Sequence, residues 1–371
     1  LSLLDYLNAR TYPDTIARAK SNLDTHGYTI EPYLTLRHPG TIACYVPYRC
    51  LLPKGLEGLL VIGLGLSAHR DAIPIVRMQA DLQNLGYAAG VAAAMAAEAG
   101  GTRAIDVRRL QQHLVDKGCL PAEVLGHEDS YPLPPERISR AVHAIPDGYQ
   151  GAAVVLSHRE QALPLLRQAY RRVEDPGAKL AYAHVLGVLG DATGIETLIE
   201  AVEAAEGLGD GYEYRGMGHD HSRRRMSQTD SLLLALGRTG DRRATPAVLR
   251  KLALLGPQAP FSHHWHVAAA LEALGDPRAA KPLADLLARP GMSGHAIETV
   301  GEAIDKERPP LGNATRLGSF REIVLARALY RCGDHDGLAR RILQSYTKDL
   351  RGHFARHAAA VLRSRGGSSG P

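Results

Sequence analysis

The chain has 371 residues, of which 45% are hydrophobic and 22% are charged, as in ordinary globular proteins. Its formal net charge is +5, but basic and acidic residues are interleaved, whereas nucleic-acid-binding proteins concentrate positive charge on one face. No apolar run reaches the roughly 18 residues that a membrane helix needs. We therefore expect neither nucleic acid nor a membrane as a partner. The four cysteines form no C-x-x-C pair, which argues against a zinc ribbon or a dithiol motif.

The first 62 residues mix helix and strand signals. Residues 1–20 have apolar positions at helical spacing and predict a helix, which Pro13 interrupts. Residues 41–52 alternate and are rich in β-branched and aromatic side chains, so they predict a strand, with an edge or bulge at Pro47. Residues 59–62 are a continuous apolar run between two glycines, which predicts a strand buried on both faces.

A helix of unusually small residues is expected next. From Gln79 the pattern is helical for about 20 residues. Glycines at 86 and 90 and alanines at 88, 89 and 92–94 leave little side-chain bulk. Such a helix can lie close to a sheet or to a flat ligand.

Residues 63–68, GLGLSA, match the dinucleotide-binding fingerprint G-x-G-x-x-G/A directly after the expected strand. In that fold the helix begins inside the motif. Here Pro74, flanked by the β-branched residues Ile73 and Ile75, keeps the chain out of a helix for about ten residues, and no second strand with a terminal acidic residue follows. A first Rossmann loop is therefore the less favoured interpretation.

Residues 46–97 instead resemble the last part of the FAD module in FAD-dependent oxidoreductases. The resemblance is carried by VPYRCLLPKG at 46–55, by Ser67-Ala68 and Arg77-Met78, and by GYAAGVAAA at 86–94. The family pattern is approximately PYRCLVPKG, a strand, GR-x-x-SA, RVMPT and GQAAG-x-AAA. The resemblance implies FAD as cofactor and a small-molecule substrate. It also implies that the N-terminus of the final helix faces the pyrimidine end of the flavin, where its dipole stabilises negative charge.

The same resemblance assigns individual residues to the site. The sequence departs from the family pattern in four places. Leu64 stands where arginine is usual and Gly65 where cysteine is usual, Arg70-Asp71 replaces His-Glu, and Gln79-Ala80 replaces Met-Pro. The implied cofactor contacts are Gly63, Gly65, Ser67, Ala68, Arg77, Met78, Gln79 and Ala80.

Three residues are candidates for the substrate side of the flavin. His26 lies in a D-x-H element that precedes the PYRC strand in the resembled family, and a histidine there could move a proton at neutral pH. A turn histidine bonded to local backbone is the alternative interpretation. Tyr48 and Arg49 could line the substrate, or they could be ordinary sheet residues.

A FAD module also needs a βαβ nucleotide-binding half, and no such pattern precedes Gly63. We therefore expect this chain to be the C-terminal portion of a longer protein, or a subunit that needs a partner. We also expect the isolated chain not to bind FAD tightly. Compartment and substrate are not indicated by the sequence.

The remainder predicts helical repeats. Residues 105–114 predict an amphipathic helix, and residues 125–137 a linker. Beyond it, four apolar helices each end at a glycine followed by an aspartate that can cap the next helix. These units resemble HEAT-like repeats and predict an α-solenoid. The expected fold is mainly α, with a small α/β piece of a flavin-binding domain in residues 1–125 and the solenoid in residues 126–371. The four glycines are Gly190, Gly240, Gly275 and Gly333.

Two histidine-rich stretches interrupt the repeats, His219-Asp220-His221 and Ser262 to His266. Their spacing matches no known metal template, so we expect no metal site. A flavin module followed by a HEAT-like tail resembles a group of bacterial FAD-dependent oxidoreductases. The favoured hypothesis is therefore an oxidoreductase. The alternative is a non-catalytic scaffold that binds a protein on its solenoid.

Overall fold

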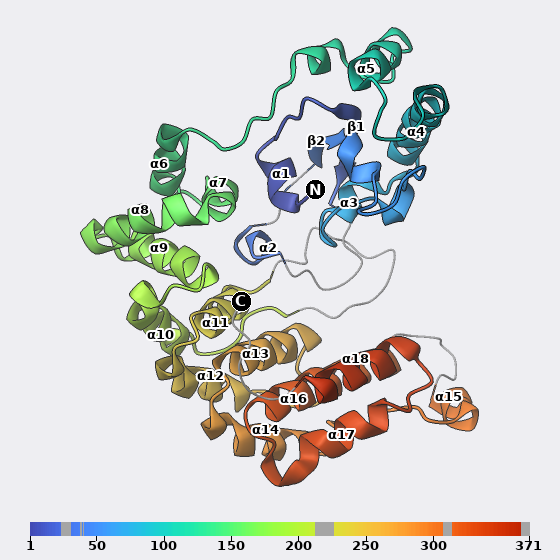
Figure 1. Cartoon of the computed structure of the whole chain (residues 1–371). Helices are drawn as coiled ribbons and strands as arrows, with labels where there is room; N and C mark the ends of the chain where they lie inside the picture. The colour runs from blue at the N-terminus through green and yellow to red at the C-terminus, as the bar shows by residue number, and fades with distance from the viewer. Residues whose placement is uncertain (24–30, 38, 40, 212–225, 307–313, 365–371) are drawn as a thin grey trace. The chain divides into compact units, whose positions relative to one another are not determined.

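The structure is a computed structural model that describes the chain except residues 24–30, 38, 40, 212–225, 307–313 and 365–371 (Figure 1). It divides into two compact units, Leu1–Leu165 and Leu166–Pro371. Helices dominate, and in the described residues the sheet has two strands. The expectation of a mainly α fold is therefore confirmed. The boundary at residue 125, which concerns the extent of the family module, stays a prediction.

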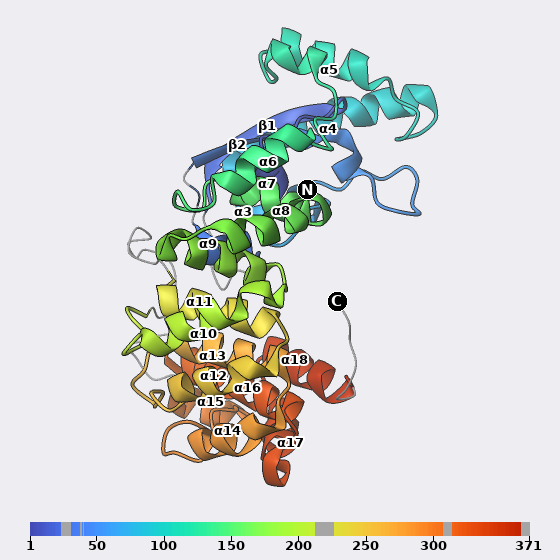
Figure 2. The same ribbon diagram turned by 90° about the vertical axis from the view of Figure 1, so that its left-hand side faces the viewer.

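The first unit is built around an antiparallel pair, β1 (Thr15–Asn22) and β2 (Thr41–Pro47). The register is irregular between Thr15 and Ala17, opposite Pro47, where the sequence predicts an edge or bulge. Strand β1 packs against α3, α4 and α5, and Figure 2 shows the strands running beside α4. The helices of this unit are α1 (Leu3–Leu7), α2 (Tyr33–Leu36), α3 (Ile73–Val76), α4 (Gln79–Ala99), α5 (Val107–Asp116), α6 (Pro135–His143) and α7 (Ala152–Ser157), and α8 (Arg159–Arg172) spans the division between the units.

The predicted helix over residues 1–20 is wrong. Helix α1 ends at Leu7, and Ala9 has a left-handed φ of 50° that no α-helix continues through. From Ala17 to Lys20 the side chains are alternately buried and exposed, which is the period of a strand. The two-residue alternation in this short stretch outweighs the helical spacing of the leucines before it.

The predicted buried strand over residues 59–62 is also wrong. The segment is irregular and pairs with neither β1 nor β2, although Val61 N donates to Leu51 O at 2.8 Å. Leu59 is 46% and Ile62 44% exposed. An apolar run becomes a central strand only when strands flank it on both sides, and the described residues provide none here.

Two other predictions in this unit are confirmed. Helix α4 begins at Gln79 and runs for 21 residues, and α5 is the expected amphipathic helix, with Leu110 and Leu114 buried. Asp106 caps α5 by accepting hydrogen bonds from two backbone N–H groups of its first turn.

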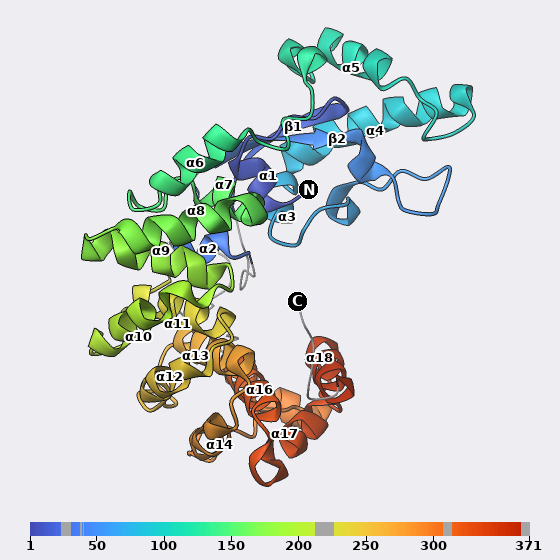
Figure 3. The ribbon, with the colours of Figure 1, turned by 60° about the vertical axis from the view of Figure 1, so that its left-hand side comes forward.

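The second unit stacks helical hairpins. One row of helices contacts in the order α9, α11, α13, α16, and a second row in the order α10, α12, α14 (Figure 3). At Gly275 the chain leaves α13 with φ 53°, and Asp276 then accepts the Arg278 N–H of the following turn, so the expected helix-Gly-Asp unit is present. The helices are α9 (Pro176–Val188), α10 (Ile195–Ala204), α11 (Gln228–Arg238), α12 (Thr245–Leu252), α13 (Phe261–Leu274), α14 (Ala280–Leu287), α15 (Val300–Lys306), α16 (Ala314–Arg331), α17 (Leu338–Tyr346) and α18 (Gly352–Arg363).

Candidate functional site

The turn at residues 63–68 lies against α4, so the structure brings the two parts of the expected cofactor site into one region. The short 3-10 turn Gly63–Gly65 contacts α4. Ser67 N donates to Cys50 O at 2.8 Å, which ties the turn to the segment after β2, while Ser67 itself is exposed. Gly63 has a φ of 66°, a conformation that glycine adopts without strain.

The N-terminus of α4 is accessible. Arg77 and Met78 are half-buried, and Gln79 and Ala80 are exposed. Asp81 lies in the first helical turn and accepts a hydrogen bond from Lys20 N at 3.3 Å, and burial raises the pKa of its carboxyl group. A negative charge at this end of a helix offsets part of its positive dipole. Sequence reasoning overlooked Asp81, although an acidic residue in the first turn is a common signal for a helix start.

The substrate-side candidates have structural partners. Tyr48 is buried, and its hydroxyl donates to Thr102 O at 2.6 Å; burial raises the pKa of Tyr48. Arg49 Nε lies 2.9 Å from Asp14 Oδ2, and hydrogen bonding to Asp14 raises the pKa of the guanidinium. His26 lies outside the described residues. The catalytic roles of these three residues stay predictions.

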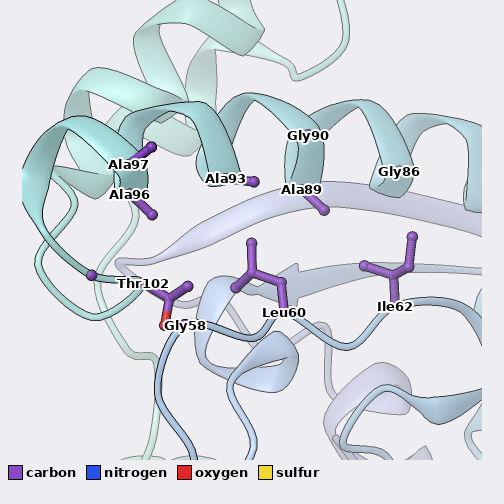
Figure 4. Close-up of a pocket in the computed structure, with 11 residues that line it drawn as sticks. Gly58, Leu60, Ile62, Gly86, Ala89, Gly90, Ala93, Ala96, Ala97 and Thr102 are labelled. Carbon is purple, nitrogen blue, oxygen red and sulfur yellow. The ribbon is translucent and has the colours of Figure 1, made fainter.

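A pocket of about 550 Å³ lies between α4 and the irregular segment at residues 58–62 (Figure 4). In Figure 4 the side chains of Leu60 and Ile62 point toward the helix, and Ala89 points back toward them. This volume is in the range of small-molecule sites. The pocket does not include the eight predicted cofactor contacts. Its lining residues are Gly58, Leu60, Ile62, Gly86, Ala89, Gly90, Ala93, Ala96, Ala97, Gly101 and Thr102.

The pocket wall formed by α4 is smooth. A Cβ atom added to Gly86 or Gly90 would meet no described atom within 4 Å outside the helix itself. Ala93 and Ala97 are exposed on the same wall. Thr102 also lines the pocket; it is buried, and its hydroxyl has no hydrogen-bond partner among the described residues. The pocket can therefore accept a flat apolar group or the backbone of another segment.

The histidines of the second unit are used inside the helix stack. His263 and His266 share one face of α13, as their spacing predicts, and both lie beside the buried carboxylate of Asp230. No group of three or more potential ligands in the described residues could hold a metal ion. The stretch His219 to His221 lies outside the described residues. Within the described part of the chain, none of the helices has the length and apolar character to cross a membrane.

Comparison with known proteins places the oxidoreductase signal in the first unit. Residues 1–114 match the model of the FAD dependent oxidoreductase family. No curated protein matches the chain. A solved structure, the complex of CpcE and CpcF of phycocyanin lyase from Nostoc sp. PCC7120, is similar with 20% identity and a TM-score of 0.32. That similarity covers 54% of this chain and 63% of the other, less than two thirds of its length. The chain thus carries an N-terminal region similar to FAD-dependent oxidoreductases.

Proposed function

We propose that residues 1–125 are the C-terminal part of the FAD module of an oxidoreductase, and that residues 126–371 are an appended HEAT-like scaffold. The observation that carries this proposal is the family match over residues 1–114, which contains both the turn at 63–68 and α4. The contact between these two elements supports a common role for them.

The glycines of α4 support the proposal that a cofactor or another protein segment packs against this helix. A glycine inside a helix costs about 1 kcal/mol relative to alanine. Neither Gly86 nor Gly90 is required by packing against described residues, because a Cβ would meet open space at both. Ile62, which lines the pocket across from α4, is 44% exposed. Both features are explained if a cofactor or a complementary protein segment lies close to α4 in the working enzyme.

The residues present suit the flavin ring better than the rest of FAD. Bound FAD would supply hydride or electron transfer. Gly63, Gly65, Ser67 and Ala68 would hold the ring edge and ribityl chain, and Arg77 to Ala80 would approach the pyrimidine end. The described pocket walls are apolar and offer no arginine or lysine for a pyrophosphate. We therefore propose that a nucleotide-binding half supplies the phosphate contacts, either from a longer protein or from a partner.

His26, Tyr48 and Arg49 are proposed to face a small-molecule substrate. Tyr48 and Arg49 lie in the 3-10 turn Tyr48–Leu51 that follows β2, and Arg49 is exposed. Because Arg49 is held by Asp14, its guanidinium has a fixed position from which a second anionic group could be bound.

The test is an absorbance scan in the flavin band. The chain is mixed with FAD, alone and together with a nucleotide-binding half. Unbound FAD, which absorbs in the same band, is removed by gel filtration, and the protein is scanned before and after dithionite. A band that appears only with both halves and bleaches on reduction supports the proposal. A protein that stays colourless with the half and FAD present contradicts it.

A pair of variants on α4 tests whether the flavin lies against the pocket wall. Gly90→Leu places a side chain in the pocket, whereas Ala94→Leu places the same side chain on an exposed position of α4 outside the pocket. We expect Gly90→Leu to weaken flavin incorporation at least about tenfold, equivalent to about 1.4 kcal/mol, and Ala94→Leu to leave it unchanged. Equal incorporation by both variants would contradict the proposed use of this wall.

A non-catalytic scaffold remains the second candidate. On α15, Val300 is 67% and Ile304 63% exposed, and the two residues are one turn apart on the same side of the helix. An exposed apolar helix face favours a protein partner on the second unit. If the flavin test fails, this face is the first place to search for a partner.

A further inference from the structure

The exposed apolar side chains of the first unit are concentrated in one short stretch. In the described part of this unit five large hydrophobic side chains are exposed, and four of them lie between residues 56 and 64. Residues 58–64, GLLVIGL, contain neither a charge nor a proline. Proteins protect exposed apolar segments with charges, proline or a covering element, because such segments otherwise aggregate. The stretch therefore indicates a surface that is covered in the working protein. The four side chains are Leu56, Leu59, Ile62 and Leu64.

The backbone of this stretch has one open edge. Val61 N donates to Leu51 O at 2.8 Å. The main-chain groups of Leu60 and Ile62 make no hydrogen bond within the described part of the chain. In an extended segment, successive residues direct their N–H and C=O groups to opposite edges. The groups of Leu60 and Ile62 therefore face away from Leu51, as the unpaired groups of an edge strand do.

Both faces of the stretch are apolar. Figure 4 shows Leu60 and Ile62 pointing toward α4. Since side chains alternate along an extended segment, Leu59 and Val61 point to the other face. Apolar side chains on both faces are typical of a strand in a parallel sheet that helices cover on both sides. Here α4 covers one face, while Leu59 remains 46% exposed and the described residues supply no neighbouring strand.

Both ends of the stretch are anchored to the rest of the first unit. Before it, Arg103 donates from Nε to Glu57 Oε1 at 2.7 Å and from Nη2 to Pro53 O at 2.6 Å. After it, Ser67 N donates to Cys50 O at 2.8 Å. A segment that is fixed at both ends loses less conformational entropy when it becomes a strand. The anchors therefore favour pairing of this stretch with a partner.

We propose that residues 59–62 form a β-strand in the assembled protein, and that the edge presented by Leu60 and Ile62 pairs with an edge strand of the nucleotide-binding half. This inference rests on the proposed function. It adds that the partner binds through main-chain hydrogen bonds and brings a helix-covered sheet with one open edge. A second copy of this chain is a poorer occupant, because it would offer the same four residues and two strands alone are marginally stable in water.

The test is amide hydrogen exchange, resolved to single residues. The full chain is measured alone and mixed with FAD and the nucleotide-binding half of a FAD-dependent oxidoreductase. In the chain alone, the Val61 amide should be protected, and the amides of Leu60 and Ile62 should exchange freely. When the half is added, we expect exchange at Leu60 and Ile62 to slow at least about 100-fold, because both amides enter the ladder.

A pair of variants at residue 60 separates strand pairing from simple apolar cover. Leu60→Pro removes the N–H group from the open edge, whereas Leu60→Thr keeps the N–H group and removes the apolar side chain. Strand pairing predicts that Leu60→Pro weakens binding of the half at least about tenfold more than Leu60→Thr does. Neither variant removes a backbone hydrogen bond that the described residues make.

Bound flavin, measured in the same mixture after free FAD is removed, separates this inference from the proposed function. Bound flavin without protection of Leu60 and Ile62 would overturn the strand pairing and leave the flavin function standing. Protection without bound flavin would support the pairing and contradict the flavin function. Absence of both overturns the pairing, as does equal binding by the two variants. Protection that rises with the concentration of the chain alone would assign the edge to a second copy and overturn the proposal.

Discussion

The glycines inside helices have different surroundings in the two units of the molecule. In α11, a Cβ on Gly237 would lie 2.5 Å from the Cα of Ala270 on α13, so the close approach of these helices requires glycine. On α4, a Cβ on Gly86 or Gly90 would meet no described atom outside the helix. In the second unit, Gly187 on α9 and Gly237 on α11 thus face packed neighbours that favour glycine, whereas no such neighbour of α4 is found among the described residues. This contrast is why we place the cofactor or its complementary half against α4.

The largest expected effect tests this difference between the glycines of α11 and α4 directly. Gly237→Ala forces α11 away from α13 and should lower the free energy of unfolding by about 2–3 kcal/mol, because a packed backbone atom must move. Gly90→Ala should raise it by about 0.5–1 kcal/mol through helix propensity. Urea denaturation followed by circular dichroism measures both. A destabilising Gly90→Ala would mean that another segment of this chain already occupies the space beside α4.

The next effect concerns the aspartates that end each repeat. Asp276 is buried and accepts hydrogen bonds from Arg278 N and from the buried hydroxyl of Thr245, at 3.0 and 2.8 Å. Asp276→Ala should cost about 2 kcal/mol, because it removes the cap and leaves Thr245 without this partner. Asp241→Ala is the matched variant, since Asp241 caps the preceding repeat at a more exposed position, and should cost about 1 kcal/mol or less.

The Asp276 effect depends on pH. Its hydrogen bonds to Arg278 lower its pKa from 3.8 to about 2 in the folded protein. A lowered folded pKa means that the stabilisation is complete above about pH 4 and is lost as the pH falls toward 2. Urea unfolding at several pH values should show the wild type and Asp276→Ala converging below pH 4. A constant difference down to pH 2 would show that the carboxylate charge contributes nothing.

The sequence was informative where structure depends on neighbours along the chain. The start of α4 at Gln79 and the Gly275-Asp276 ending of α13 were predicted correctly, because helix spacing and capping are local properties. The strand over residues 59–62 was predicted wrongly, because a central strand depends on partners that local pattern does not reveal. The alternation from Ala17 to Lys20 was a local signal for β1 that was overlooked.

The candidate sites show the same difference between local signals and contacts of distant segments. The small residues of α4 predicted a surface for close approach, and the pocket lies along that helix. The opposite wall and the buried Thr102 hydroxyl depend on how distant segments fold together. Asp230 and His263 are 33 positions apart and meet only because α11 packs on α13. Their contact could not be read from two histidine-rich stretches in the sequence.

The smallest expected effect decides between two roles for Tyr48. Its hydroxyl donates to the backbone oxygen of Thr102, a residue that lines the pocket, so Tyr48→Phe should lower the free energy of unfolding by about 1 kcal/mol. Tyr87→Phe is the control: its exposed hydroxyl lies 3.0 Å from His113 Nε2, and its loss should cost less than about 0.5 kcal/mol. Thermal unfolding measures both. If Tyr48→Phe leaves stability unchanged but abolishes reduction of a bound flavin by substrate, the Tyr48 hydroxyl serves the reaction and the bond to Thr102 does not hold the pocket wall.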